Sequence, residues 1–358
     1  MEQRVRFCGI DVGSQTIKLV CQLDAGSREF GGAMIFKEGP SPGSLVDHSG
    51  DPNTLGTALA SLRVQAGIGL RRVPAAVSMP TGAMATKVVH LPPLTNRERQ
   101  AAFQLELERF LSLGDQDVVG DYFPLAAEGG GSGNQESYLL MATQQRLINL
   151  LRNALKAAHV QPEAIEPEPV TLFRLLQLLS RSRTEGTHVL VDLGASGTRV
   201  VVSRQGQLLM FRELGVGGKH LTAALARALN MEWHEAETLK RSRYQEAEEI
   251  PELSAEAHRL RKEIERSLRY VERERGIEGY NGLYIVGGGA EWPFIRSLVE
   301  QAVGVRAREE LVLPGGAVAP SMAQAAALAF YRQVIPEMMP APQMRGVRRQ
   351  PVEGGLGR

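Results

Sequence analysis

The residues best suited to chemistry form a short polar turn near the start of the chain, between two apolar segments whose residues alternate as strands do. The turn contains Asp11, Gly13, Ser14, Gln15, Thr16 and Lys18. Glycine lets the backbone approach an anion closely, the hydroxyls and the lysine can donate to phosphate oxygens, and the carboxylate of Asp11 can hold a hydrated magnesium ion. The turn also suits an ordinary β-hairpin, so on its own it leaves both interpretations open.

A second turn of the same kind occurs in the second half of the chain, again between two apolar segments. It contains Asp192, Gly194, Ser196, Gly197 and Thr198. The two turns are too far apart for a solenoid repeat, so they predict two related lobes. If the turns face each other across a cleft, both can cradle phosphate. Asp11 and Asp192 can then each offer a carboxylate, through water, to a shared metal ion.

Two further glycine-rich segments can border a ligand. Gly287, Gly288 and Gly289 follow a short apolar strand and precede a helix, and such a turn lets a flat ligand lie against the backbone. Gly217 and Gly218 open another predicted helix, whose N-terminus favours phosphate. A glycine-containing helix boundary accounts for this second pair equally well.

Composition and charge exclude several classes of function. The chain has 358 residues, of which 43% are hydrophobic, and this is enough for two or three domains. Its 41 basic and 40 acidic side chains give a net charge of +1, so nothing indicates binding to nucleic acid. The longest uncharged run, residues 311–331, contains prolines, glycines and polar side chains, which argues against direct insertion into a membrane.

The cysteines and the N-terminus indicate a compartment. Cys8 and Cys21 fall on the two arms of the first hairpin, and we expect them to pack as buried thiols rather than to form a disulfide or a metal site. The N-terminus lacks the apolar segment of a signal peptide. Both features fit a reducing cytoplasm.

The order of predicted strands and helices divides the chain into two lobes with insertions. One insertion reads strand, helix, strand, strand, helix, and the last residues are rich in Pro, Gly, Met and Arg, which is typical of disorder. The predicted parts are lobe I with the first turn at 1–81, the inserted subdomain at 82–158, a return to lobe I at 159–186, lobe II with the second turn at 187–216, a helical subdomain of lobe II at 217–276, the rest of lobe II with the glycine run at 277–312, a C-terminal helix of lobe I at 313–335 and a disordered tail at 336–358.

In the order turn, turn, glycine run, these motifs resemble the nucleotide site of the actin, Hsp70 and sugar-kinase superfamily. Longer segments, among them GIDVGSQTIKLV, VSMPTGAMATKVVHLPPL and LGVGGKHLTAALARALNMEWHEAETLK, resemble the PilM family of actin-like type IV pilus assembly proteins. The chain is also similar to the cell-division protein FtsA, which has an inserted subdomain, termed 1C, in the same place. The resemblance implies an α/β actin-like ATPase fold with two ribonuclease-H-like lobes and an FtsA-type 1C subdomain.

The same resemblance implies roles for the residues of the motifs. The two turns become the phosphate loops for ATP, Asp11 and Asp192 hold Mg²⁺ through water, and the glycine run borders the nucleoside. Glu237 and Lys240 would reach the adenine or the ribose. Glu168, where actin-like ATPases connect their lobes, would orient an attacking water.

The family implies a cytoplasmic ATP-binding protein of the type IV pilus assembly platform, held peripherally at the inner membrane through its partner. The expected partner is the N-terminal cytoplasmic peptide of a PilN-like inner-membrane protein, bound between the first lobe and the inserted subdomain. Pilus assembly ATPases and a homo-oligomer remain open as further partners. Only Glu168 supports turnover, so we expect weak ATPase activity or none.

Three alternatives stand beside this interpretation. An FtsA-like protein would form filaments and reach lipid through an amphipathic tail helix, which Pro336, Pro340 and Pro342 prevent here. A small-molecule kinase of the same superfamily would need a substrate base near the first turn, and no unassigned Asp stands in a suitable position. A scaffold could also have kept the two loops for folding alone.

Overall fold

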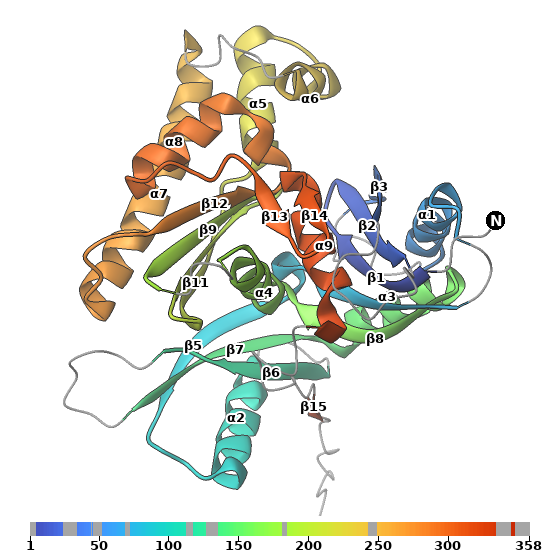
Figure 1. Cartoon of the computed structure of the whole chain (residues 1–358), viewed down its shortest axis with the longest axis vertical. Helices are drawn as coiled ribbons and strands as arrows, with labels where there is room; N and C mark the ends of the chain where they lie inside the picture. Colours follow the sequence, from blue (N-terminus) through green and yellow to red (C-terminus); the bar gives the residue numbers. More distant parts are fainter. Residues whose placement is uncertain are drawn as a thin grey trace, which may run out of the picture.

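Figure 1 shows the computed structural model, in which two lobes stand side by side and a smaller subdomain lies below them. The structure describes residues 5–23, 34–43, 45, 52–68, 72–111, 117–126, 135–180, 185–242, 249–333 and 345–347. Each lobe and the subdomain is built on a sheet of its own. No helix within the described ranges is long and apolar enough to cross a membrane.

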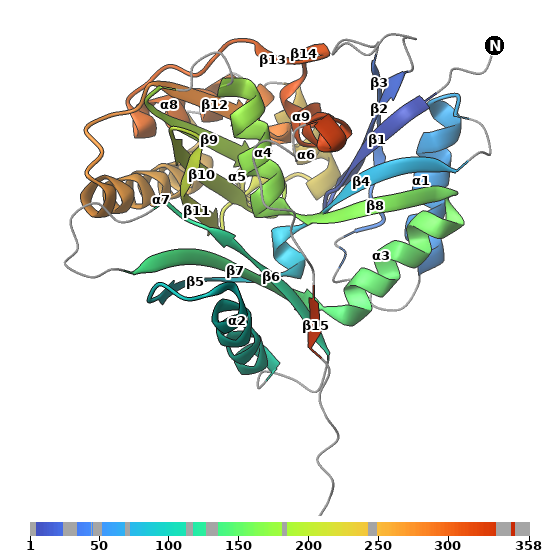
Figure 2. The same ribbon diagram turned by 60° about the horizontal axis from the view of Figure 1, so that its bottom comes forward.

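Lobe I is built on a five-stranded sheet with the strand order β3-β2-β1-β4-β8. Its strands are β1 (Val5–Val12), β2 (Thr16–Leu23), β3 (Met34–Pro40), β4 (Val73–Met79) and β8 (Val160–Pro167). β2 runs antiparallel to β1 and β3, whereas β4 runs parallel to β1 and β8. α1 (Pro52–Gln65) and α3 (Gln145–Ala157) cover one face, and α9 (Ala323–Ala329) covers the other (Figure 2).

Lobe II repeats this arrangement in a four-stranded sheet with the order β11-β10-β9-β12. Its strands are β9 (Thr187–Leu193), β10 (Thr198–Arg204), β11 (Gln207–Leu214) and β12 (Gly282–Val286). β10 runs antiparallel to β9 and β11, and β12 runs parallel to β9. The four strands therefore match β3-β2-β1-β4 in order and direction, and the two related lobes predicted from the repeated turn are present.

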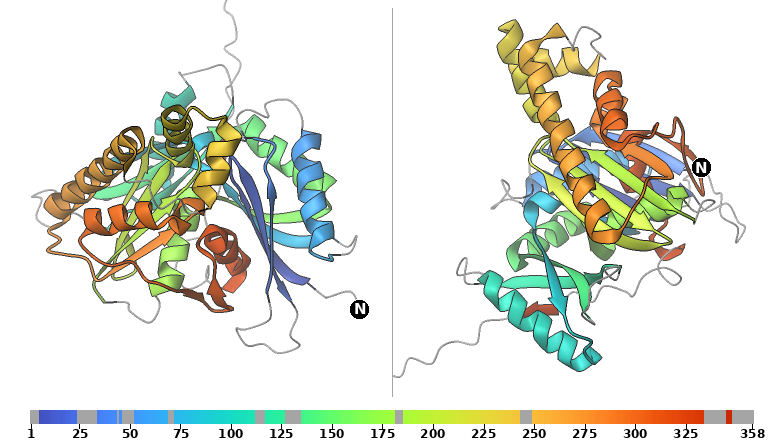
Figure 3. Two further views of the ribbon diagram at one scale, coloured as in Figure 1. Left: turned by 90° about the horizontal axis from the view of Figure 1, so that it is seen from above. Right: turned by 90° about the vertical axis from the view of Figure 1, so that its left-hand side faces the viewer.

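Helices cover both faces of the lobe II sheet. α5 (Gly218–Leu229), α7 (Pro251–Arg275) and α8 (Pro293–Val303) share one core with the sheet, and α6 (Trp233–Arg241) joins that core through Ala236. α4 (Glu168–Ser180) packs on the opposite face. The long α7, which runs along the outer face of lobe II in Figure 3, buries an apolar residue at every third or fourth position and ends at Gly276, whose φ is 58°.

Short elements complete the lobes near their junction. A 3-10 turn, η1 (Thr81–Ala83), follows β4, and a second, η3 (Gly288–Glu291), contains part of the glycine run. The hairpin of β13 (Leu311–Leu313) and β14 (Gly316–Val318) leads into the 3-10 turn η4 (Pro320–Met322) and then α9.

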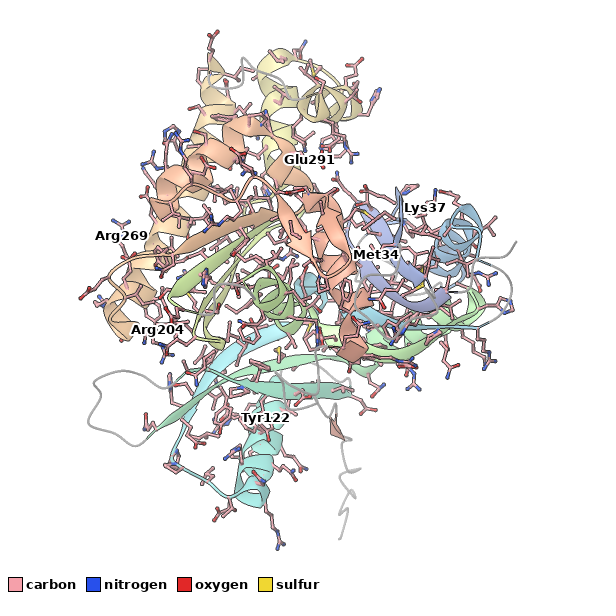
Figure 4. The ribbon with its side chains drawn as sticks, viewed as in Figure 1. Met34, Lys37, Tyr122, Arg204, Arg269 and Glu291 are labelled. Carbon is pink, nitrogen blue, oxygen red and sulfur yellow. A yellow bond between two sulfur atoms is a disulfide. The ribbon has the colours of Figure 1, made fainter. Side chains whose placement is uncertain are left out.

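The inserted subdomain contains β5 (Ala85–Leu91), α2 (Asn96–Leu111), β6 (Val118–Pro124) and β7 (Glu136–Gln144). Phe103 of α2 stacks on Tyr122 with ring centroids 3.8 Å apart, and Tyr138 meets both rings edge-on. This aromatic cluster fixes α2 on the sheet (Tyr122 is labelled in Figure 4).

The predicted subdomain range of 82–158 is too long at its C-terminal end. It included α3, but Leu147, Leu151 and Leu155 of that helix are buried in the core of lobe I. The periodicity of an amphipathic helix shows that it has an apolar stripe, but not which sheet that stripe covers. α3 therefore belongs to lobe I.

The tail is not disordered throughout. Residues 345–347 form β15 (Arg345–Val347), which pairs antiparallel with β6 at the edge of the subdomain sheet. An edge strand presents unpaired N–H and C=O groups, so it can order a segment that has no core of its own. The remaining residues of the predicted tail, 336–344 and 348–358, lie outside the described residues.

The cysteines form a disulfide rather than the two thiols expected from the sequence. Cys8 and Cys21 are direct partners in the β1–β2 ladder, and their Cα atoms are 4.3 Å apart. Residues paired directly across antiparallel strands have close side chains. The register of the first hairpin therefore brings the two sulfur atoms together.

The packing of α9 on β1 depends on Gly9. A Cβ atom at this position would overlap the carbonyl oxygen of Ala325 and the amide nitrogen of Ala329, both of which are backbone atoms of α9. Backbone atoms cannot turn aside as a side chain can, so α9 lies against the sheet only because residue 9 has no side chain.

We predict that Gly9→Ala lowers the free energy of unfolding by about 1–3 kcal/mol, the usual cost of overpacking. Urea denaturation measures the change. Gly279→Ala is the matched control, because an added Cβ there meets no atom within 4 Å, and it should change stability by less than about 0.5 kcal/mol. Equal stability of the two variants would contradict the close packing of helix on strand.

Candidate functional site

A cavity of about 340 Å³ opens between the two lobes, at the ends of β1 and β9 that carry the polar turns. It gathers most residues that the sequence motifs predicted. Those that line it are Asp11, Gly13, Ser14, Gln15, Thr16, Lys18, Glu168, Asp192, Gly194, Ser196, Gly218, Glu237, Lys240, Gly287, Gly288 and Gly289. Segments that are distant in sequence thus meet at one place.

The first turn places a lysine against its own aspartate. Asp11 and Lys18 are partners in the β1–β2 ladder, and Lys18 Nζ lies 3.0 Å from Asp11 Oδ2. Ser78 Oγ donates to the other carboxylate oxygen at 3.2 Å. Burial lowers the pKa of Lys18, but Asp11 and Asp192 more than offset this, so its pKa lies above the ordinary value and the side chain stays charged.

The second turn repeats this pairing with an arginine. Asp192 and Arg199 are partners in the β9–β10 ladder, and Arg199 Nη1 lies 3.5 Å from Asp192 Oδ2. Burial lowers the pKa of Arg199, but Glu168, Asp192 and Glu213 raise it further than burial lowers it. The predicted site did not include Arg199. The spacing could have revealed it, because in both turns a cation follows the aspartate by seven positions.

Three of the predicted ligand-binding residues do not line the cavity. Gly197 and Gly217 lie back to back, since a Cβ on Gly217 would be 2.5 Å from the Gly197 nitrogen. The Thr198 hydroxyl donates to the carbonyl of Val216 at 2.7 Å. These residues fasten the second turn to the segment before α5.

The N-terminus of α5 is likewise used within the protein. The amides of Gly218 and Lys219 donate to the carbonyls of Gly194 and Ala195 at 2.9 and 2.8 Å. The sequence offered the glycine pair either as a phosphate-binding helix start or as a helix boundary. Because these two amides already have acceptors, the contacts favour the boundary, and they hold the second turn in its position.

The glycine run after β12 forms an open floor. Gly287 has a φ of 84°, and a Cβ there would be 2.5 Å from Asp192 Oδ1, so only glycine fits. An added Cβ at Gly288 would meet nothing within 4 Å. Trp292 and Glu291 line the same side of the cavity (Glu291 is labelled in Figure 4). A flat ligand can therefore approach the backbone here.

A hydrogen-bonded group on α5 and α6 forms another wall. Lys240 Nζ lies 2.6 Å from Glu237 Oε2 and donates to the Gly218 carbonyl at 3.1 Å. Thr222 Oγ1 donates to Glu237 Oε2 at 2.6 Å. Burial raises the pKa of Glu237, but the hydrogen bonds from Lys240 and Thr222 outweigh it, so the pKa is lowered and the carboxylate is charged. Glu237 and Lys240 are thus a fixed polar pair.

Glu168 begins α4 and is held at the junction of the lobes. Its Oε2 accepts hydrogen bonds from the Thr81 amide at 2.6 Å and the Thr81 hydroxyl at 2.5 Å. The same oxygen lies 3.3 Å from Arg199 Nη2. One of the two oxygens of the carboxylate that the motif assigned to an attacking water is therefore already engaged by protein groups.

The charges around the cavity fit a magnesium-bound polyphosphate. Six carboxylates and four cations line it, namely Asp11, Glu38, Glu168, Asp192, Glu237 and Glu291 against Lys18, Arg199, Lys240 and Arg241. An anion enters such a site more readily with a divalent cation. Within the described residues, no three His, Cys, Asp or Glu side chains can hold a metal by themselves. Mg²⁺ suits this arrangement because it keeps several waters and takes one or two carboxylates with phosphates.

Comparison with known proteins decides the family. Residues 9–314 match the family model described as type IV pilus assembly protein PilM. The chain belongs to the PilM family. A chain of the solved PilM-PilN type IV pilus biogenesis complex superposes with a TM-score of 0.72 at 25% identity, covering 93% of this chain and 100% of that one. The PilM resemblance read from the motifs is confirmed.

Two more distant proteins support the actin-like fold that the sequence predicted for this PilM-family chain. Cell division protein FtsA of Streptococcus pneumoniae serotype 2 (strain D39 / NCTC 7466) is 22% identical over 343 residues, covering 84% of this chain and 74% of FtsA. Ethanolamine utilization protein EutJ from Carboxydothermus hydrogenoformans superposes with a TM-score of 0.52 at 16% identity, covering 90% and 89%. The actin-like ATPase fold is confirmed.

Asp192 should make the stability of this PilM-family protein depend on pH. Burial, with Glu168 and Asp11 adding to it, outweighs Arg199 and raises the pKa of Asp192 from 3.8 to about 6. Between these values the folded protein holds a proton that the unfolded chain has lost. The contribution of Asp192 to stability is therefore greatest below about pH 4 and is lost as the pH rises through about 6.

We predict that Asp192→Asn removes this dependence. The difference in unfolding free energy, wild type minus variant, should fall by up to about 3 kcal/mol between about pH 4 and about pH 7. Urea denaturation of both proteins across this range measures it. A difference that stays constant with pH would show that the carboxyl group titrates near its ordinary value.

Proposed function

We propose that this chain is an ATP-binding protein of the type IV pilus assembly platform that binds the N-terminal cytoplasmic peptide of a PilN-like membrane protein. The observation that carries the nucleotide proposal is the meeting of the two turns and the glycine run around one cavity. Each turn brings a glycine, a hydroxyl and an aspartate–cation pair. This combination suits a triphosphate between the turns and a nucleoside on the glycine floor.

Magnesium would be held through water by Asp11 and Asp192, and when bound it would neutralise part of the phosphate charge. Ser14, Thr16 and Ser196 also line the cavity and can supply hydroxyl donors. Glu237 and Lys240 would meet the ribose or the adenine. The fixed hydrogen bonds of that pair favour a defined orientation of the ligand over a loose fit.

We further propose that turnover is slow or absent. A carboxylate that orients an attacking water must be free to accept its hydrogen bonds. In Glu168 one oxygen already accepts two hydrogen bonds from Thr81 and lies near Arg199. Only the other oxygen is left for an attacking water, which suits slow turnover and a role as a switch.

The partner peptide is proposed to bind between lobe I and the inserted subdomain. The solved relative is described as a PilM-PilN complex, which supports a PilN-like partner. The turn η1 offers a physical link between the nucleotide site and the partner site. Thr81 bonds Glu168, Gly82 and Ala83 line the cavity, and the Ala83 carbonyl accepts a hydrogen bond from Thr143 of the subdomain at 2.6 Å. A movement at the nucleotide would therefore reach the subdomain through three residues.

Location follows from the partner. Through a PilN-like membrane protein, the chain would lie on the cytoplasmic side of the inner membrane without inserting into it. Pilus assembly ATPases and further copies of this chain are additional partners that the platform would bring within reach.

We predict that Asp11→Ala and Asp192→Ala each weaken binding of magnesium-ATP by about tenfold or more, because each removes a carboxylate that would hold the metal's water. Isothermal titration calorimetry with ATP, with and without magnesium, measures this. Asp117→Ala is the control, because Asp117 is exposed in the inserted subdomain. Wild-type affinity in both cavity variants would refute the assigned metal ligands.

We also predict saturable binding of a short N-terminal PilN peptide from the same genome, with an affinity that changes when magnesium-ATP is present. Calorimetric titration with the peptide and with a scrambled peptide of equal composition tests this. Peptide binding that is insensitive to ATP would remove the coupling through η1. The absence of binding in either state would refute the partner.

A further inference from the structure

Arg199 is a cation of the cavity for which the sequence motifs gave no role, and its contacts are loose for a buried guanidinium. Nη1 lies 3.5 Å from Asp192 Oδ2, and Nη2 lies 3.3 Å from Glu168 Oε2 and 3.7 Å from a carboxylate oxygen of Glu213. A strong charge-assisted hydrogen bond measures about 2.7–2.9 Å. None of the three carboxylates holds this side chain at that distance.

The guanidinium also has donors to spare. Nη1 donates to the Gly197 carbonyl at 3.2 Å, but Nε is buried and has no hydrogen-bond partner among the described residues. Arginine carries five N–H donors in a rigid fork that matches the oxygens of a phosphate. The residue is only 5% exposed, and it lines the cavity. A phosphate in the cavity would find an underused donor group there.

The position of Arg199 in the fold supports the same ligand. It lies directly against Gly194 of the second turn, where an added Cβ would overlap Nη1. It is the counterpart in lobe II of Lys18 in lobe I, since each faces the aspartate of its own turn. Lys18 is bound to Asp11 at 3.0 Å, whereas Arg199 has no contact as short with a carboxylate. Of the two cations, Arg199 is therefore the one freer to change partner.

We propose that Arg199 binds the terminal phosphate of ATP and is the residue by which the site distinguishes ATP from ADP. The inference rests on the proposed ATP site. In the proposed site the phosphates lie between the two turns, and Arg199 faces the aspartate of the second turn. Its guanidinium lies 3.3 Å from Glu168, which begins α4 where the two lobes meet, so its fork is at the phosphate end of the cavity.

This binding would also change the ion pair between lobe II and α4, the helix that begins at the junction of the lobes. As the structure stands, Arg199 of lobe II lies between Asp192 on its own sheet and Glu168 on α4. A terminal phosphate that draws the guanidinium away leaves Glu168 with Thr81 as its partner. ADP lacks this phosphate and would leave the arginine on Glu168. The Arg199–Glu168 ion pair would therefore be absent with ATP and present with ADP.

The test compares the affinities of the full chain for magnesium-ATP and magnesium-ADP in wild type, Arg199→Gln, Arg199→Lys and Arg204→Gln. Arg204 is the control, because it lies at the far end of the same strand and does not line the cavity (Figure 4). We expect wild type and Arg204→Gln to prefer ATP. Arg199→Gln should bind ATP about ten- to one-hundredfold more weakly while its ADP affinity stays within about threefold.

Thermal unfolding shows whether each variant folds. If Arg199→Gln does not fold because it has lost the charge, Arg199→Lys still tests the proposal. Lysine retains the charge but not the fork, so we expect its preference for ATP to be smaller than in wild type. An unchanged ratio of ATP to ADP affinity in the folded Arg199 variants would overturn the proposal, as would an equal loss of both affinities. If wild type binds neither nucleotide, both the ATP site and this inference fail.

Discussion

The structure depends on two carboxylates that are buried where the sheets of the two lobes meet. Asp11 and Asp192 are 7% and 5% exposed, and a buried charge is costly unless it is paired. Each is paired from within its own hairpin, by Lys18 or Arg199 on the next strand. The hairpin register therefore places each aspartate beside the cation that compensates its charge. Because the lobes are related, this aspartate–cation pair occurs once in each lobe.

The two aspartate–cation pairs differ in how closely their partners approach. Lys18 is close enough to Asp11 for a strong hydrogen bond, whereas Arg199 is shared among three carboxylates and satisfies none closely. Asp192 is consequently the less closely paired of the two aspartates, and burial raises its pKa. An incoming metal ion would compensate the charge of Asp192, and a phosphate would give Arg199 a closer acceptor. Lobe II is thus the side on which a ligand changes the interactions most.

The local parts of this arrangement were predictable from the sequence. Alternating apolar residues around an Asp-x-Gly turn indicate a hairpin, and the repeat of the turn predicted two related lobes. The partners of Arg199 were not predictable in this way, because Glu168 and Glu213 reach it from other elements. The same limit applies to the Cys8–Cys21 pair and to α3, since neither a strand register nor the sheet beneath a helix follows from periodicity alone.

α4 then determines how far a change at the cavity can spread. Glu166, just before the helix, receives two hydrogen bonds from the fully buried Arg174, at 3.1 and 2.5 Å. This pair fixes the start of α4 to its second turn, so Glu168 cannot shift without the helix. Phe173 of the same helix packs edge-on against Phe123 of the inserted subdomain, with ring centroids 5.4 Å apart. A change in the partners of Glu168 therefore acts on a rigid element that touches both lobes and the subdomain.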